Sequence, residues 1–189
     1  MKQGAFFLDR DGTINVDHVY INDPRLVELI PRAARAIRNL RERGFLAIVV
    51  TNQSGVGRGI IKPDALPRIH ERLDELLKEE ASGLDAYEIC VHAPQERCAC
   101  RKPSPFLVNE AVKLHDIDLS RSVFIGDKLS DVATGKNAKC KYSILVRTGK
   151  GQQEEILIQL TPKPAPEETP DYIADDLADA VDWALSKLQ

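Results

Sequence analysis

Short apolar runs alternate with helical patterns along the chain, and this alternation constrains the fold more than any other feature. The runs are rich in β-branched and other apolar residues and occupy 5–8, 46–50, 87–91, 123–125 and 143–146. Runs of this length and composition are typical of buried strands. Strands that alternate with helices form parallel sheets with helices on both faces. The sequence therefore predicts an α/β fold with a Rossmann-like parallel sheet.

Five helices are predicted between and after these strands. Pro31 opens the first helix and Gly44 ends it, because the apolar side chains between them recur at helical spacing. The others are expected at the apolar stripe within 66–77, from 106 to 114, in a short segment after Asp131, and from 177 to 188. The stretch 161–171 is proline-rich and polar, which predicts an exposed connector before the last helix.

Size and charge narrow the class of protein. A chain of 189 residues with 43% hydrophobic content is expected to form one domain, 1–189. Its formal net charge of -3 comes from interspersed acids and bases, with no basic run for nucleic acid and no apolar stretch of membrane-spanning length. The apolar run at the N-terminus is too short for a signal peptide. We expect a cytoplasmic monomer that binds neither nucleic acid nor membrane.

Acidic residues follow two of the predicted strands. Asp9 and Asp11 come directly after the first strand, and Asp127 and Asp131 follow the fourth. Ligands of parallel sheets bind beyond the carboxyl ends of the strands. Neighbouring carboxylates repel one another unless a cation lies between them, and Mg²⁺ prefers such oxygen ligands. One Asp-x-Asp-Gly is more often a turn, but acids at two strand ends favour a metal site.

Donors for phosphate oxygens are expected in two other stretches. The second strand leads into a loop over 51–59 that contains hydroxyls, amides, glycines and Arg58. Arg101 and Lys102 add a pair of cations before the fourth strand. Each stretch alone would be an ordinary glycine-rich loop or a solvated surface.

Taken together, these four stretches resemble, in order and spacing, the signature of the haloacid dehalogenase-like phosphatases from Phe6 through Asp131. The resemblance implies that Asp9 attacks phosphorus, and that Asp11 protonates the leaving oxygen and later activates water. It also implies that Thr51 holds the phosphoryl oxygens and that Lys102 screens negative charge.

The resemblance further implies a catalytic Mg²⁺ ion. Asp9, the backbone carbonyl of Asp11, and Asp127 would bind it, with Asp131 outside the ligand set. The gaps between the motifs hold only one helix or so each, so there is little sequence for a cap domain. A capless, open site whose loops give specificity is expected.

A cysteine-histidine cluster predicts a second metal site. Cys90, His92, Cys98 and Cys100 lie within eleven residues of a cysteine-poor chain. Four such ligands form a closed tetrahedral Zn²⁺ site, which is structural because no position remains for water. Unrelated buried thiols are the alternative. A zinc ion here would hold the loop, 90–100, that leads to Arg101 and Lys102.

The substrate is predicted from the loops around the site. Among the phosphatases that this chain resembles, a zinc loop occurs in enzymes for sugar bisphosphates and for histidinol phosphate. The loops 9–20 and 52–59 resemble the sugar-bisphosphate enzymes, although Val19 replaces a frequent glycine and the zinc loop is short. A bisphosphate also carries a second phosphate that is bound but not cleaved, and additional cationic side chains around the site could bind it. The substrate-binding residues predicted on this basis are Asp17, His18, Tyr20, Asn52, Gln53, Ser54, Arg58, Arg101 and Lys128.

The sequence thus predicts a phosphatase with a small phosphorylated sugar as its partner. A histidinol-phosphate phosphatase on the same scaffold remains an alternative. A non-catalytic phosphosugar-binding module is a second one, and the intact acids Asp9, Asp11 and Asp127 argue against it.

Overall fold

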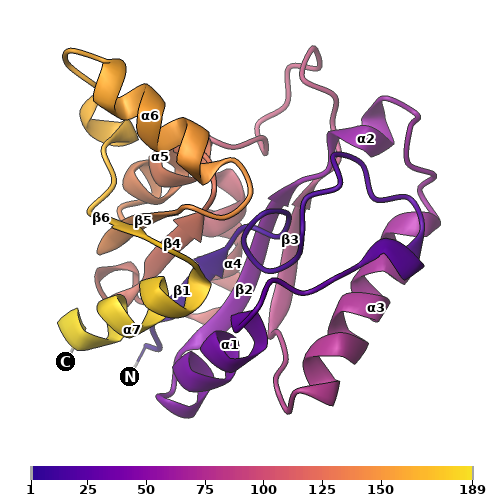
Figure 1. Cartoon of the computed structure of the whole chain (residues 1–189), viewed down its shortest axis with the longest axis horizontal. Helices are drawn as coiled ribbons and strands as arrows, with labels where there is room; N and C mark the ends of the chain where they lie inside the picture. The colour runs from indigo at the N-terminus through magenta and orange to yellow at the C-terminus, as the bar shows by residue number, and fades with distance from the viewer. Residues whose placement is uncertain (1, 189) are drawn as a thin grey trace.

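The computed structural model describes residues 2–188 and contains one parallel sheet of six strands (Figure 1). The strands lie in the order β3-β2-β1-β4-β5-β6. Their bounds are Ala5–Leu8 (β1), Leu46–Asn52 (β2), Ala86–Cys90 (β3), Val123–Gly126 (β4), Tyr142–Val146 (β5) and Tyr172–Ala174 (β6). The predicted Rossmann-like sheet is confirmed, and all five predicted strands lie in it.

The strand order reverses its direction between β1 and β4, and the register aligns their carboxyl ends. Leu8, the last residue of β1, lies opposite Val49 of β2 and Ile125 of β4. In an open parallel sheet, the crevice for ligands forms where the strand order reverses. The residues that follow β1, β2 and β4 therefore meet at one crevice.

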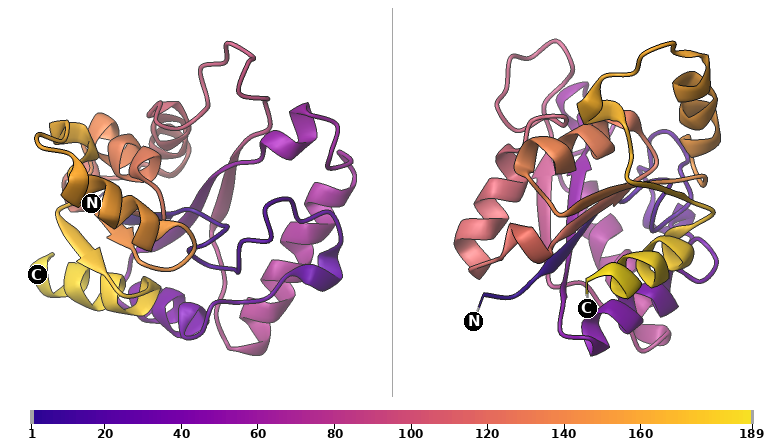
Figure 2. Two further views of the ribbon diagram at one scale, coloured as in Figure 1. Left: turned by 45° about the horizontal axis from the view of Figure 1, so that its top comes forward. Right: turned by 90° about the vertical axis from the view of Figure 1, so that its left-hand side faces the viewer.

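Helices cover both faces of the sheet, as predicted (Figure 2). One face packs against α1 (Ala33–Glu42), α3 (Ala65–Glu79) and α7 (Leu177–Lys187) in the larger apolar core. The other face packs against α4 (Phe106–His115) and α5 (Leu129–Ala138). Within residues 2–188, no domain is inserted between the strands, in line with a capless fold.

Among the α-helices and strands, four differ from the sequence-based expectation. The helix expected after Asp131 is α5, which begins two residues earlier because the Asp131 carboxylate accepts the Lys128 backbone N–H and so caps the first turn. The strand β6 was not predicted, since its three residues are too few for a visible alternation. The short helix α2 (Ser54–Gly57) was not predicted either.

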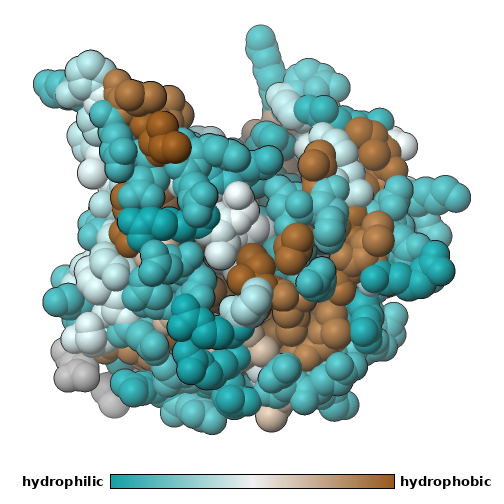
Figure 3. Space-filling model, in the orientation of Figure 1, coloured by the Kyte–Doolittle hydropathy of each residue, from teal (hydrophilic) through white to brown (hydrophobic). Residues whose placement is uncertain are grey.

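The helix α6 (Gly151–Leu160) was also missed, because its apolar side chains do not form a stripe that faces the core. Ile156, Leu157 and Leu160 are exposed, and Figure 3 shows the resulting apolar patch over α6 at the upper left. The residues of the predicted connector lie between α6 and β6 and are mostly exposed, with one 3-10 turn at Pro166–Glu168. Among residues 2–188, no helix has the length and apolar character that crossing a membrane requires.

Candidate active site

The acids at the ends of β1 and β4 meet at the crevice, as the sheet topology requires. Asp9 directly follows β1, and Asp127 directly follows β4. The turn after Asp9 passes very close to Asp127: a Cβ atom on Gly12 would lie 2.3 Å from Asp127 Oδ2. Gly12 also has a φ of 84°, a conformation that favours glycine. The glycine of the Asp-Gly motif is thus what lets the two acidic loops approach.

Three carboxylates form a buried cluster there. Oxygen atoms of Asp9, Asp127 and Asp131 lie within 4.8 Å of one another, and all three residues are buried. Among residues 2–188, Asp127 Oδ1 is one of few buried side-chain oxygens without a hydrogen-bond partner, and the Lys128 ammonium group lies 3.5 Å from it. Burial and the nearby Asp9 raise the pKa of Asp127 to about 7. Carboxylate oxygens, a buried acceptor without a hydrogen bond and mutually repelling charges together fit a divalent cation such as Mg²⁺.

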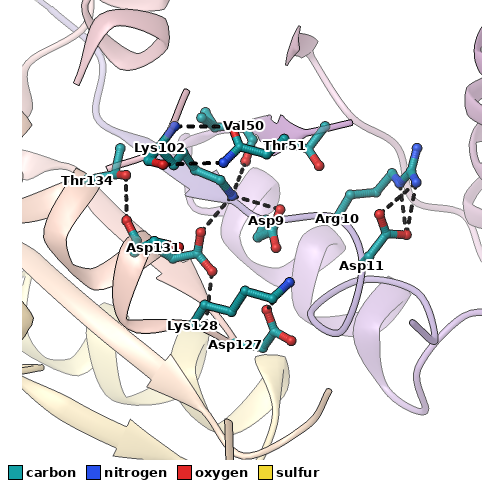
Figure 4. A network of polar contacts seen from close by, with 12 residues as sticks. Asp9, Arg10, Asp11, Val50, Thr51, Lys102, Asp127, Lys128, Asp131 and Thr134 are labelled. Carbon is teal, nitrogen blue, oxygen red and sulfur yellow. Dashed lines mark hydrogen bonds and ion pairs between the residues drawn. The ribbon is translucent and has the colours of Figure 1, made fainter. Parts of the chain in front are cut away.

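Lys102 partly neutralises this cluster (Figure 4). Its Nζ lies 2.8 Å from Asp9 Oδ1 and 2.6 Å from Asp131 Oδ1, and it donates to the carbonyl of Val50 at 2.8 Å. Burial opposes the charge of the ammonium group, but Asp131 and Asp9 outweigh it and raise the pKa of Lys102. The lysine therefore stays cationic beside Asp9. Asp131 faces Lys102 and the Lys128 N–H, which suits a residue outside the metal's ligand set.

The Asp11 side chain turns away from Asp9 and toward Arg10 (Figure 4). Both of its oxygens accept hydrogen bonds from Arg10, at 2.7 to 3.1 Å. Asn15 donates to Oδ1 at 2.9 Å, and Gln53 donates to Oδ2 at 2.9 Å. Burial favours the neutral acid, but Arg10 and the other donors outweigh it and lower the pKa of Asp11. The carboxylate is thus held in the form that can accept a proton.

Arg10 is a site residue that the sequence analysis missed. It lies between the two aspartates, and it is only 1% exposed although it carries a guanidinium group. Its partners come from the loop after β2 and from α3, namely Gln53 and His70. A charged residue between two acids in a loop looks like a solvated neighbour, so nothing local in the sequence signals this burial.

A cleft of about 370 Å³ opens over the cluster. Most of the predicted substrate-binding residues line it: Asp17, Tyr20, Asn52, Gln53, Ser54, Arg101 and Lys128. His18 and Arg58 are exposed and lie outside this lining. The predicted catalytic residues Asp9, Asp11, Thr51 and Lys102 are brought together here as well.

Two of the lining amides are directed toward the protein. Asn52 accepts the Lys102 backbone N–H at 3.1 Å, so it holds the loop that presents Lys102. Gln53 donates to Thr51 Oγ1 at 2.9 Å in addition to its contact with Asp11. In contrast, the buried Nη1 of Arg101 has no hydrogen-bond partner within residues 2–188, so this guanidinium keeps a donor for an anionic ligand.

The loop before α6 also contributes to the site. The Lys150 backbone N–H donates to Asp127 Oδ2 at 2.8 Å, and Thr148 Oγ1 donates to the carbonyl of Gly12 at 2.6 Å. Lys150, Ser130 and Val19 line the cleft, and the sequence analysis gave none of the three a role. A lone lysine in a Thr-Gly-Lys stretch far along the chain has no local signal, and only the fold places it at the cleft.

The cysteine-histidine loop has the dimensions of a metal site. Sγ of Cys90 lies 3.7 Å from Sγ of Cys98 and 3.6 Å from Nδ1 of His92, which lies 3.2 Å from Sγ of Cys100. Two sulfurs bound at about 2.3 Å to a tetrahedral zinc ion are about 3.8 Å apart. Burial raises the pKa of the Cys90 thiol to about 12, so a cation is needed to keep it a thiolate. The four predicted ligands thus fit Zn²⁺.

Comparison with known proteins agrees with this geometry. The sequence model of the haloacid dehalogenase-like hydrolases matches residues 7–139, and a second, HAD-hydrolase-like model matches 99–180. A relative from Haemophilus influenzae, D-glycero-beta-D-manno-heptose-1,7-bisphosphate 7-phosphatase, is 35% identical over 93% of both chains. A relative from Thermosynechococcus vestitus, D-glycero-D-manno-heptose-1,7-bisphosphate 7-phosphatase, is 38% identical over 100% of this chain and 98% of its own.

A solved structure is similar over its whole length. The D,D-heptose 1,7-bisphosphate phosphatase from B. bronchiseptica, complexed with magnesium and phosphate, superposes with a TM-score of 0.85. It is 32% identical, and the match covers 99% of each chain.

Proposed function

The chain belongs to the haloacid dehalogenase-like hydrolase family, and we propose that it is a Mg²⁺-dependent phosphatase that removes the 7-phosphate of D-glycero-D-manno-heptose 1,7-bisphosphate. One observation carries the proposal above all: Asp9 lies against the Lys102 ammonium group and beside Asp127, at the point where the strand order reverses. The relatives' names agree with the prediction of a sugar-bisphosphate enzyme. The product, a heptose 1-phosphate, suits nucleotide activation on the way to lipopolysaccharide.

The reaction proceeds in two steps on this chain's own residues. A carboxylate oxygen of Asp9 attacks the 7-phosphorus and forms an aspartyl phosphate, while the bond to the sugar oxygen breaks. Asp11, once it has taken up a proton, gives that proton to the leaving oxygen and returns to the ionised form in which its donors hold it. It then takes a proton from the water that attacks phosphorus and releases phosphate from Asp9. Thr51 and Lys102 hold and screen the phosphoryl oxygens throughout.

The metals support this chemistry. Asp9, the carbonyl of Asp11, and Asp127 would hold Mg²⁺, which supplies charge neutralisation for the transferring phosphoryl group. Cys90, His92, Cys98 and Cys100 would hold a structural Zn²⁺. The distal phosphate is gripped by the cations that line the cleft, above all Arg101 with its free Nη1 and Lys128.

The test is a side-by-side assay of phosphate release with Mg²⁺. The substrates are the α and β anomers of the heptose 1,7-bisphosphate and histidinol phosphate, each compared by kcat/KM. A strong preference for one heptose anomer supports the proposal and names the anomer. A preference for histidinol phosphate would support the mechanism but show that the proposed substrate is wrong. If none of the esters is hydrolysed, the alternative of a non-catalytic phosphosugar-binding module would remain.

We also propose that the chain works in the cytoplasm as a monomer. The support for the location is the state of the cysteines: Cys90, Cys98, Cys100 and Cys140 are all free, and three of them belong to a metal-ligand cluster. Thiol ligands persist in a reducing compartment. Light scattering of the purified chain at micromolar concentration tests the monomer.

A further inference from the structure

Arg10 is held from two sides. On one side its Nε and Nη2 donate to the Asp11 carboxylate, and Nη2 also donates to Gln53 Oε1. On the other side its Nη1 lies 3.1 Å from Nε2 of His70, which projects from α3. Both Arg10 and His70 are buried, at 1% and 8% exposed. The guanidinium therefore bridges the proposed acid-base residue and a histidine distant in the sequence.

The direction of the His70 contact follows from chemistry. A guanidinium carries only donors, so Nε2 of His70 accepts the hydrogen bond and the ring proton lies on Nδ1. Burial, with Arg10 beside it, lowers the pKa of His70 to about 4, which agrees with a neutral ring at neutral pH. A protonated ring would present a second donor to Arg10, and the contact would be lost.

The ring itself is fixed from outside the site. His70 stacks on Tyr87 of β3, with the ring centroids 4.5 Å apart and the planes 19° from parallel. The hydroxyl of Tyr87 donates to Asp74 Oδ1 at 2.7 Å, one turn along α3 from His70. Helix α3 and strand β3 thus set the orientation of the histidine before it meets Arg10.

We infer that His70 is a positioning residue for Asp11, which it orients through Arg10. Without the acceptor, Nη1 of Arg10 would be a buried donor without a partner, which is an unfavourable state. The guanidinium would turn toward other acceptors and carry the Asp11 carboxylate with it. This inference rests on the proposed function, because it assumes that Asp11 delivers a proton to the leaving group.

Two variants with two esters test it. His70→Leu removes the acceptor, whereas His70→Gln keeps an oxygen acceptor near the place of Nε2. The esters are the heptose 1,7-bisphosphate, whose alkoxide must be protonated, and p-nitrophenyl phosphate, whose phenolate leaves without a proton. The readout is kcat/KM, which reports the first step. Glu71→Gln, an exposed neighbour on α3, is the matched control.

A positioning role affects the two esters differently. We expect His70→Leu to lower kcat/KM about tenfold for the heptose ester and less than about threefold for the aryl ester. We expect His70→Gln to stay within about threefold of the unmodified chain on both esters, and Glu71→Gln to match it. The inference would be overturned if His70→Leu lowered kcat/KM equally for both esters or for neither. It would also be overturned if His70→Gln lowered kcat/KM for the heptose ester as much as His70→Leu does.

A measurement on the unmodified chain guards against a variant that does not fold. The ¹⁵N chemical shifts of His70 at pH 7 should show that Nδ1 is protonated and that Nε2 is not. A proton on Nε2 would overturn the inference whatever the kinetics. If the unmodified chain releases phosphate from neither ester, the proposed function is wrong. The tautomer of His70 would then test only the hydrogen bond between His70 and Arg10.

Discussion

Asp9 and Asp11 have the same side chain but opposite surroundings. Asp9 lies within a cluster of acids and against Lys102, where a charged oxygen faces the cleft. Asp11 lies within a cage of donors formed by Arg10, Asn15 and Gln53. The first environment suits a nucleophile beside a cation, and the second suits a group that takes and returns a proton.

Asp9→Asn should nearly abolish turnover and leave the fold intact. The amide is of the same size but is not a nucleophile, so kcat is expected to fall at least about a thousandfold. Phosphate release and a thermal melt measure the two effects. Asp182→Asn, on the exposed face of α7, is the control and should retain full activity. Near-normal turnover in Asp9→Asn would refute the aspartyl-phosphate mechanism.

At the scale of elements, three loops assemble the metal site. The loop after β1 supplies Asp9, the loop after β4 supplies Asp127, and the loop before α6 closes over Asp127 through the Lys150 N–H. Gly149 of this third loop has a φ of 56°, and a Cβ atom there would lie 2.3 Å from Asp127 Oδ2. The loop can therefore take this conformation beside Asp127 only with glycine at position 149.

Gly149→Ala should displace Asp127 and weaken the response to Mg²⁺. We expect a loss of about 1–3 kcal/mol in the free energy of unfolding and at least about a tenfold higher Mg²⁺ concentration for half-maximal activity. Denaturant unfolding and a Mg²⁺ titration of kcat measure them. Gly44→Ala is the matched control, because Gly44 also has a positive φ, 82°, but no atom within 4 Å of the added Cβ. An unchanged Mg²⁺ response in Gly149→Ala would contradict the role of this loop.

A zinc ion in the cysteine-histidine loop would act on catalysis through the segment that follows the loop. Cys100 is two residues from Lys102, so the metal would fix the start of the segment that Asn52 holds from the other side. Metal analysis should find one zinc per chain, bound independently of Mg²⁺. Cys98→Ser should lower both the melting temperature and kcat.

Cys140→Ser is the control for the zinc prediction, because Cys140 lies outside the cluster and should not change the zinc content. Zinc-free protein with full stability and activity would show that the site is not structural.

At the scale of the whole molecule, the last strand and helix complete the core. Leu177, Val181 and Ala184 of α7 are fully buried in the larger core together with α1. Trp183 stacks on Tyr172 of β6 with the ring centroids 4.8 Å apart. The segment after the connector is thus part of the fold and not an appendage.

A chain truncated after Leu160 should not fold to a soluble, active form. The truncation uncovers the faces of α1 and β5 against which α7 and β6 pack, and exposed apolar area of this size leads to association. Size-exclusion chromatography and phosphate release measure the outcome. The control replaces 162–165 in the exposed connector with glycine and serine and should keep both properties. A monodisperse, active truncated chain would contradict this account.

The positions of the acids and of the zinc ligands could be predicted from the sequence, whereas the place of Lys102 in the site was implied by the family resemblance. The reason is topological: the strands are parallel, so whatever follows them along the chain meets at one edge of the sheet. The zinc ligands are close in sequence, so their spacing alone brings them together. The α/β class followed in the same way from the alternation of strand and helix patterns.

Other features depend on packing between distant segments. The burial of Arg10 requires His70 from α3, and Lys150 reaches Asp127 only because β5 lies beside β4. Asn52 turns toward the Lys102 backbone, a direction that a residue type does not encode. The strand β6 is too short to carry a periodic signal and forms because β5 offers it an edge. Such contacts have no local signature, since each one needs a partner that the folded chain alone supplies.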